Sequence, residues 1–372
     1  MNTLYTKVEI MEIAVLGGGH GGYAAAADLS KKGHQVRFWR RDAAGFQPII
    51  DAGAITVHDY KGEREVAIHN PTKSLADAVD GAELIVIPLP SLSHVALAKD
   101  LALHLRDGQV VYLPPGTFGS YIFARALRDA GNKADVSFAE TGTLPYLARK
   151  HGSRRVVISG YATRLPTGVL PSKNTDYAFE VLLKAYPVER CEDALSGALM
   201  NAGPIIHPPL ILMNAGPLEH FDTWDIHNEG TQPAIRRTTD ALDEERMALR
   251  EALTYGAPHF PLKDHYNGAG EGDEWMYGRA AHEKLTDSGD WREDIDLKTH
   301  RYMLEDTRLG LSFLVSVGRW AGVAMPIAEG LLSIASPVSE RTLYEEGRTL
   351  ESLGLAHLSR AEMTQLLTEG PS

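Results

Sequence analysis

A glycine-rich turn near the start of the chain limits the fold more than any other feature of the sequence. Residues 13–22 read IAVLGGGHGG, so an apolar strand runs directly into the spacing G-x-G-x-x-G, with glycines at positions 17, 19 and 22. The alanine-rich residues 24–27 follow and favour a helix. In such a strand–turn–helix unit, the first glycine allows the tight turn and the second lets a pyrophosphate approach the backbone. The third lets the helix pack against the strand.

The start of that helix is the expected phosphate site, because its free N–H groups and the positive end of its dipole face the turn. An ordinary strand-to-helix turn is the alternative, and the strand before the glycines and the helix after them weigh against it. The sequence therefore predicts a dinucleotide cofactor bound by Gly17, Gly19, His20, Gly21 and Gly22.

The end of the second expected strand indicates which dinucleotide is bound. Domains that bind NAD usually place an acid there, about 20 residues after the turn, to contact the ribose 2′-hydroxyl. This chain has Arg40 at that point and Arg41 next to it. Two guanidinium groups suit a 2′-phosphate, so NADP(H) is favoured. The alternative is a solvated basic pair, with Asp42 binding the ribose of NAD(H).

Short apolar runs alternate with helical patterns through the first half of the chain, which is the rhythm of a βαβ fold. Strands are expected at residues 13–16, 35–39, 83–87, 109–113, 136–139 and 155–159, and helices at 22–32, 75–79, 92–105 and 120–130. Most of these strands are apolar on both faces, as in a parallel sheet covered by helices. A smaller repeat continues to about residue 190. Residues 1–190 are therefore predicted to form a Rossmann dinucleotide-binding domain.

The second half of the chain has a different pattern. Residues 193–255 and 296–366 follow the helical period of 3.6 with almost no strand signal, and residues 258–294 are rich in Gly, Asp and His and indicate irregular structure. Residues 191–372 are therefore predicted to form an all-helical domain that carries the substrate and the chemistry.

Composition removes several classes of partner. The chain has 372 residues and a net charge of −12, so nucleic acid and anionic membranes are poor partners. No apolar run is long enough to span a membrane, and no signal peptide is evident. Cys191 is the only cysteine, which excludes an internal disulfide and a zinc site built on paired cysteines. We expect no metal site and a cytoplasmic protein.

Candidate catalytic groups lie in the helical half. Residues 185–262 contain no lysine, which argues against a lysine-centred site on the early helices. They do contain His207 in the apolar run PIIHPPLIL, beside prolines expected to interrupt a helix. A histidine between apolar neighbours is often a core residue; the alternative is an acid–base catalyst.

A second candidate, Asp306, falls on the apolar stripe of an expected helix. A carboxylate there needs a cationic or hydrogen-bonding partner, and an imidazole from another helix would serve; a surface acid is the alternative. Glu305 is expected to pair with Arg301 on the outer face. Arg301 and Asp306 are about 140° apart around an α-helix, so only a long guanidinium reaching over the helix edge brings both to one ligand.

At this point the chain resembles a known family, the opine (octopine/nopaline) dehydrogenases, and within them the bacterial N-(1-carboxyethyl)norvaline dehydrogenase type. The resemblance rests on five segments: the glycine-rich turn 16–22, AET at 139–141, residues 201–215, RYMLED at 301–306, and EGRTLESLGL at 346–355. It implies a Rossmann domain followed by a helical domain of the 6-phosphogluconate dehydrogenase C-terminal-like type.

The resemblance also implies residue roles. His207 and Asp306 match the catalytic pair of the family, and Arg301 and Thr141 match residues associated with the keto-acid carboxylate. Glu140, next to Thr141, is placed with the substrate-binding residues. The arginines at 40 and 41 depart from the aspartate of the bacterial relative, which affects the cofactor and not the fold.

The function implied is that of an NAD(P)-dependent oxidoreductase acting on the CH–NH group. It condenses the amine of an amino acid with a 2-keto acid such as pyruvate and reduces the product. Two alternatives stay open: a ketopantoate-type reductase that needs no amine, and a non-catalytic NADP-sensing protein. The expected partners are small molecules, and a homodimer is one expectation for the assembly.

Overall fold

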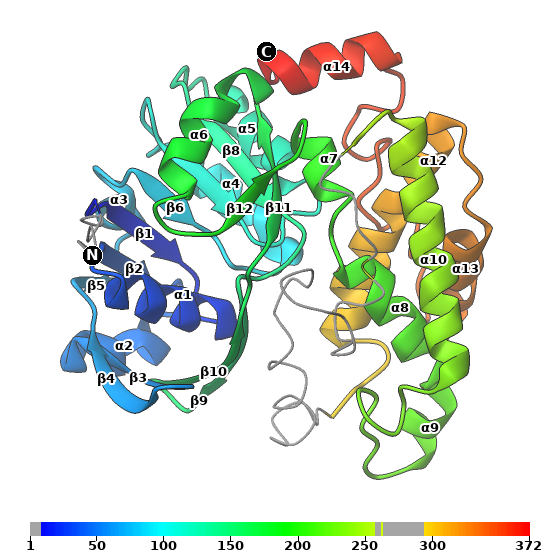
Figure 1. The fold of residues 1–372 in the computed structure, drawn as a ribbon, viewed down its shortest axis with the longest axis horizontal. Helices are drawn as coiled ribbons and strands as arrows, with labels where there is room; N and C mark the ends of the chain where they lie inside the picture. The colour runs from blue at the N-terminus through cyan, green and yellow to red at the C-terminus, as the bar shows by residue number, and fades with distance from the viewer. Residues whose placement is uncertain (1–8, 257–261, 263–293) are drawn as a thin grey trace, which may run out of the picture.

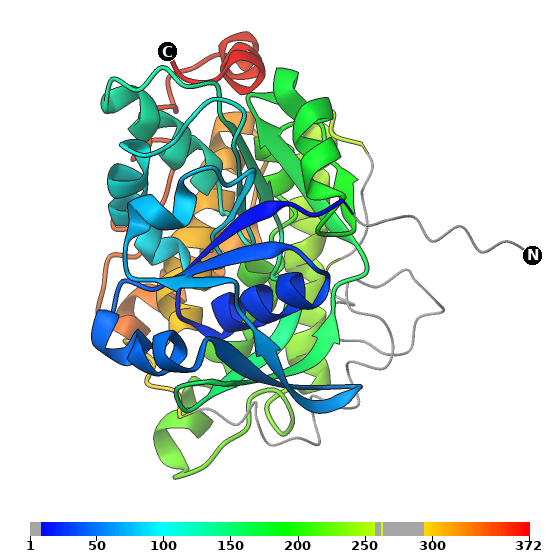
Figure 2. The same ribbon diagram turned by 90° about the vertical axis from the view of Figure 1, so that its left-hand side faces the viewer.

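The computed structural model describes residues 9–256, 262 and 294–372. They form an α/β domain followed by a helical domain, which lie side by side in Figure 1. Viewed from the side of the α/β domain, its strands lie in front of the helical domain (Figure 2). The expected order of the two domains is confirmed. Most of the region expected to be irregular, residues 258–294, lies outside the described residues.

The core of the α/β domain is an eight-stranded sheet with the order β12-β11-β8-β7-β6-β1-β2-β5. All neighbouring pairs are parallel except β8 and β11, which are antiparallel. The strands are β1 (Glu12–Leu16), β2 (Gln35–Trp39), β5 (Asn70–Thr72), β6 (Leu84–Val86), β7 (Val110–Leu113), β8 (Ser137–Thr141), β11 (Leu165–Leu170) and β12 (Val188–Arg190). Five of the six expected strands lie here with small shifts at their ends, so the Rossmann prediction is confirmed.

A second sheet, with the order β4-β3-β10-β9, was not predicted. It consists of β3 (Ala54–Asp59), β4 (Gly62–Ala67), β9 (Tyr146–His151) and β10 (Arg155–Tyr161). The strand expected at residues 155–159 is therefore real but belongs to this sheet, which corrects its placement in the parallel one. The reason is visible in β10, where buried residues alternate with half-buried ones, so only one face is fully covered.

The helices of the α/β domain are α1 (His20–Lys31), α2 (Ala43–Ala52), α3 (Leu75–Val79), α4 (His94–Ala102), α5 (Gly119–Asp129) and α6 (Thr175–Leu182), with short 3₁₀ turns η1 (Ser91–Ser93) and η2 (Ser172–Asn174). Helix α2 was not expected. Its N-cap is Asp42, whose side chain accepts a hydrogen bond from the backbone N–H of Gly45.

The described helices of the second domain are α7 (Ala194–Ala198), α8 (Gly203–Met213), α9 (Ala215–His220), α10 (Pro233–Ala252), η4 (Tyr302–Leu311), α12 (Ser312–Ala321), α13 (Pro326–Ser339) and α14 (Arg360–Glu369). Residues 341–359 are turns and coil, so the helical pattern expected to continue to residue 366 is interrupted. After these turns the chain returns to the α/β domain, where α14, red in Figure 1, packs against β11 and η2.

No helix in the described part of the chain is long and apolar enough to cross a membrane. Within the same ranges, no group of three or more His, Cys, Asp or Glu side chains is arranged to hold a metal ion.

Candidate active site

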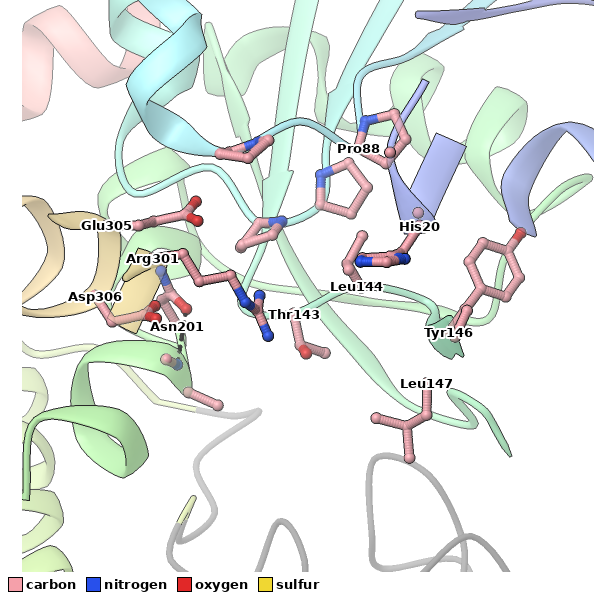
Figure 3. Close-up of a pocket in the computed structure, with 18 of the residues that line it drawn as sticks. His20, Pro88, Thr143, Leu144, Tyr146, Leu147, Asn201, Arg301, Glu305 and Asp306 are labelled. Atoms are coloured by element: carbon pink, nitrogen blue, oxygen red, sulfur yellow. Dashed lines mark hydrogen bonds between the residues drawn. The ribbon is translucent and has the colours of Figure 1, made fainter. Parts of the chain in front are cut away.

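A cleft of about 200 Å³ lies where the glycine-rich turn faces the helical domain. Its walls include Gly19, His20, Pro88, Thr143 and Arg149 from the α/β domain and Asn201, His207, Arg301, Glu305 and Asp306 from the helical domain. Figure 3 shows Arg301, Glu305 and Asp306 on one wall and His20 on the opposite one. Arg301 extends across the cleft towards Thr143. The cleft therefore joins the predicted cofactor turn to the predicted catalytic groups.

The glycine-rich turn has the geometry that a dinucleotide needs. Gly17 has a φ of +129°, a conformation that other residues rarely adopt. A Cβ at Gly22 would overlap the carbonyl oxygen of Gly17, so only glycine lets α1 approach β1 this closely. A Cβ at Gly19 would meet no atom within 4 Å, so the turn is open at this point. No side chain among the described residues caps the start of α1 at Gly19, which is the end of a helix that favours bound phosphates.

His207 and Asp306 form a buried pair across two packed helices, α8 and η4. The Nδ1 atom of His207 lies 2.7 Å from Oδ2 of Asp306, and each residue is 8% exposed. A Cβ at Gly203, in the first turn of α8, would overlap Oδ1 of Asp306. The aspartate can therefore approach the histidine only because residue 203 is glycine.

Burial sets the protonation of the acids in the cleft. It raises the pKa of Asp306 to about 7, and the positive charges of Arg301 and His300 offset this rise in part. Burial and the neighbouring Asp306 likewise raise the pKa of Glu305 to about 7. The Asp306 carboxyl beside His207 therefore titrates near neutral pH, where acid–base catalysts operate.

Arg301 and Asp306 come to the same cleft for a reason that differs from the expectation. The segment Tyr302–Leu311 is a π-helix, with Arg301 as its N-cap. Its i→i+5 hydrogen bonds bring residues five apart close together, whereas an α-helix places them about 140° apart. Both side chains line the cleft without Arg301 having to reach over the helix edge.

The outer-face position expected for Glu305 beside Arg301 is wrong, although both residues line the cleft and the charge of Arg301 acts on Glu305. Glu305 is only 8% exposed, and its carboxylate accepts a hydrogen bond of 2.7 Å from the backbone N–H of Ser91 in the α/β domain. The sequence spacing permits an i,i+4 pair, but the π-helix turns residue 305 towards the domain boundary.

The interruption expected at the prolines is also wrong. Helix α8 continues through Pro208 and Pro209, with His207 in its middle. Each proline removes one N–H from the helix interior, which costs about 3 kcal/mol in an isolated helix. All of the residues from Pro204 to Leu212 are buried, so tertiary packing outweighs this local loss.

Glu140 and Thr141, expected at the substrate, do not line the cleft. Thr141 is fully buried in β8 and donates a hydrogen bond of 2.6 Å from its hydroxyl to the carbonyl of Pro166. Glu140 is fully buried and accepts a hydrogen bond from the hydroxyl of Ser120. Thr143, two residues further along the chain, reaches the cleft instead.

The two arginines after β2 behave differently. The Nη2 atom of Arg40 lies 2.7 Å from Oδ2 of Asp42, and Nη1 donates a hydrogen bond of 3.2 Å to the carbonyl of Gly45. A Cβ at Gly18 would overlap the Arg40 side chain, so this arginine lies against the glycine-rich turn. Arg41 is exposed.

Sequence reasoning missed three polar residues of the cleft, Thr143, Arg149 and Asn201. Asn201 donates a hydrogen bond of 2.9 Å to the Thr117 hydroxyl and accepts one of 3.0 Å from the N–H of Gly203. Asn201 belongs to segment 201–215, which carries the family resemblance. Its position just before a helix start could have indicated a polar role for its side chain. Arg149 lies on β9, whose sheet was not expected.

Comparisons with known proteins identify related families and folds. Residues 190–339 match the family profile "NAD/NADP octopine/nopaline dehydrogenase, alpha-helical domain", and residues 12–121 match "NAD-dependent glycerol-3-phosphate dehydrogenase N-terminus". Among solved structures, octopine dehydrogenase with NADH and pyruvate has a TM-score of 0.67 at 19% identity and covers 95% of this chain and 98% of its own. Yersinopine dehydrogenase with NADP⁺ bound has a TM-score of 0.64 at 15% identity, over 96% and 98%. Both likenesses concern the fold.

One curated protein is more similar in sequence than these two structures. The opine dehydrogenase of Arthrobacter sp. (strain 1C) is 30% identical over 365 residues, which span 95% of this chain and 98% of that protein. The resemblance noted in the sequence is thereby confirmed. At this identity along nearly its whole length, the chain belongs to the opine dehydrogenase family, NAD(P)-dependent oxidoreductases that act on the CH–NH group.

Proposed function

We propose that the cleft condenses the amine of an amino acid with a 2-keto acid and that His207, Asp306 and Arg301 carry the chemistry. The observation that supports this most is the buried His207–Asp306 pair, 2.7 Å apart, in the same cleft as Arg301 and the glycine-rich turn. The amine attacks the keto carbon, water leaves, and the resulting imine is reduced to a secondary amine with two carboxylates. The reverse reaction oxidises that amine.

Each side chain has a distinct task in this scheme. Arg301 holds the carboxylate of the keto acid, for which a planar guanidinium is suited. His207 moves protons to and from the oxygen and nitrogen at the reacting carbon, while Asp306 keeps its ring oriented and favours its charged form. The bound cofactor supplies the hydride, and Gly19, His20 and the start of α1 would hold its phosphates.

A second arginine in the cleft, Arg149, favours an opine substrate over a simple keto acid. Arg149 is 8% exposed and lines the same cleft as Arg301. The product of an opine dehydrogenase carries two carboxylates, one from each substrate, and two guanidinium groups match that pattern. A reductase acting on one keto acid needs only one of them.

We propose NADP(H) as the preferred cofactor and NAD(H) as the alternative. Arg40 lies against the turn, and its position after β2 is the one that contacts the adenosine ribose in this fold. Within the family fold, relatives with NADH and with NADP⁺ both occur, so the choice depends on these local charges.

The test is a screen of 2-keto acids, each with and without a panel of amino acids, in which oxidation of NADPH and NADH is followed by absorbance. We expect oxidation only when keto acid and amino acid are both present, with a condensed, reduced product in the mass spectrum. His207→Ala should lower kcat about 10²–10⁴-fold while cofactor binding stays close to wild type.

Two outcomes would contradict the proposal. Equal rates with the keto acid alone would identify a ketopantoate-type reductase. Cofactor binding without oxidation, for every pair tested, would identify an NADP-sensing protein.

Location and assembly stay predictions from the sequence. A cytoplasmic protein is compatible with Cys191, a buried free thiol whose pKa burial raises to about 12, so that it resists oxidation. The homodimer is likewise a prediction, and sedimentation measurements would test it.

A further inference from the structure

The first residue of the π-helix, Tyr302, lies directly against the proposed acid–base group. Its ring is fully buried and stacks on the imidazole of His207, with ring centroids 3.7 Å apart and planes inclined by 13°. This is a parallel face-to-face contact at close range. The remaining edge of the histidine meets Asp306 at Nδ1. Ring face and carboxylate together fix the plane and the rotation of the imidazole.

Tyr302 is itself held from several sides. Its hydroxyl shares a hydrogen bond of 2.9 Å with Nε2 of His227 and accepts a longer one of 3.4 Å from Nη2 of Arg301. The guanidinium carbon of Arg301 lies 4.8 Å from the ring centroid. The rings of His300 and Tyr302 are nearly perpendicular, with their centroids 4.6 Å apart. The tyrosine therefore touches both proposed groups, the proton carrier His207 and the carboxylate ligand Arg301.

The face of an aromatic ring carries negative charge density, so it attracts a cation placed over it. A protonated imidazole stacked at 3.7 Å is such a cation, whereas a neutral imidazole gains less. The contact thus favours the charged form of His207, which the reduction of an imine consumes as a proton source.

We propose that Tyr302 is a positioning residue, which orients the His207 ring and favours its protonated form; this inference rests on the proposed role of His207. Nothing in it requires Tyr302 to touch a substrate. It acts through His207. Because it also contacts Arg301, it links the position of the proton carrier to that of the carboxylate ligand.

Other charges also act on His207, and a test must hold them constant. In the described part of the chain, the titratable groups that share the cleft or border Tyr302 come from both domains. They are Asp306, Glu305, Arg301, His300 and His227 from the helical domain and His20, Tyr146 and Arg149 from the α/β domain. Substitutions confined to residue 302 leave the number and type of these charged groups unchanged, and Tyr302→Phe separates the hydroxyl contacts to His227 and Arg301 from the effect of the ring.

The experiment measures the apparent pKa of His207 by NMR in the full-length protein, with the signal assigned by its loss in His207→Gln. Tyr302→Phe keeps the ring and should leave this pKa within a few tenths of wild type. Tyr302→Met removes the aromatic face at similar volume and should lower it by about one unit. Pentafluorophenylalanine at position 302 keeps the shape and reverses the ring charge distribution, so it should lower the pKa as well and serves if the methionine variant does not fold.

Kinetics complete the test. With pyruvate and the amino acid that supports the fastest NADPH oxidation, Tyr302→Met should lower kcat about tenfold and move the alkaline limb of the pH profile to lower pH, because protonated His207 is the required form. The KM of pyruvate should change less than about threefold. Tyr112→Met, which removes a fully buried tyrosine from β7, is the matched control for lost packing and should leave kcat and the His207 pKa unchanged.

A wild-type His207 pKa in both the methionine and the pentafluoro variants would overturn the proposal and make Tyr302 a packing residue. The NMR measurement needs no turnover, so it stands apart from the proposed function. If the pKa shifts as expected but no keto acid and amine react, the proposed function fails and the effect of Tyr302 on His207 holds.

Discussion

Arg40 makes two contacts, to Asp42 and to the carbonyl of Gly45, that hold its guanidinium beside the glycine-rich turn. A 2′-phosphate would add charge-assisted hydrogen bonds, each worth about 1.5–3 kcal/mol. Arg40→Asp should therefore lower the ratio of kcat/KM for NADPH to that for NADH by at least about tenfold. The measurement is steady-state kinetics with both cofactors.

The control is Arg125→Asp, which reverses an exposed charge whose described partner is Asp129 on the same helix, α5. It should leave the cofactor ratio unchanged. A ratio that stays at its wild-type value in Arg40→Asp would favour NAD(H), with Asp42 binding the ribose.

At the scale of single residues, the sequence indicated polar groups that stand among apolar neighbours, but it did not indicate the side of a strand on which a residue lies. His207 and Asp306 stood out as polar residues among apolar neighbours, and the structure brings them together. Thr141 was carried over from a family pattern, but the strand turns its hydroxyl to Pro166. Which face of a strand a residue occupies depends on register with its neighbours, and one chain alone does not contain that register.

The approach of Asp306 on η4 to His207 on α8 depends on the glycine at position 203. Gly203→Ala would place a methyl group onto Oδ1 of Asp306 and push the carboxylate away from His207. A displacement of about 1 Å at a catalytic group costs up to about 100-fold in rate, so we expect kcat to fall between tenfold and 100-fold. The KM of NADPH should change little, because the cofactor turn belongs to the other domain.

Gly216→Ala is the matched control, since a Cβ there meets no atom within 4 Å. It should keep wild-type kcat. Full activity in Gly203→Ala would mean that the 2.7 Å contact between His207 and Asp306 is not needed for turnover.

Elements were predictable where burial is uniform. Strands of the parallel sheet, such as β7 with four buried residues, read as continuous apolar runs. The second sheet was not predicted because one of its strands, β4, lacks a continuous apolar run. Its sequence, GEREVA, has exposed charges at alternate positions. The π-helix was not predictable either, because its apolar residues also fit the spacing of one face of an α-helix. The tight packing of Gly310 against Pro204 becomes visible only in three dimensions.

At the scale of the molecule, Arg348 joins the C-terminal segment to the α/β domain. Its guanidinium donates hydrogen bonds to the carbonyls of Gly116, Thr117 and Ser91, and the side chain is buried. Arg348→Met would leave these carbonyls and the nearby Glu140 without a cation. We expect a loss of about 3–5 kcal/mol in the free energy of unfolding, measured by chemical denaturation.

The loss should depend on pH in a defined direction. Burial raises the pKa of Glu140 to about 7, and Arg348 opposes that rise. A raised pKa means that stability from the protonated acid is full below about 4.5 and is lost as pH rises through about 7. Without Arg348 the pKa rises further, so the deficit of Arg348→Met should be larger at pH 8 than at pH 5. Arg360→Met, an exposed arginine on α14, is the control, and equal deficits at the two pH values would contradict the prediction.

The contact between Arg348 and Gly116 also has a consequence for synthesis of the protein. Its two ends are 232 residues apart in the chain. At roughly 5–20 residues per second, a ribosome needs roughly 12–46 s to travel that distance. Throughout this interval the loops of the first domain that receive Arg348 are uncovered in the emerging chain, and so is the surface that receives α14 once β11 and η2 have been synthesised. Nascent-chain holding factors therefore have a defined window and a defined surface on which to act.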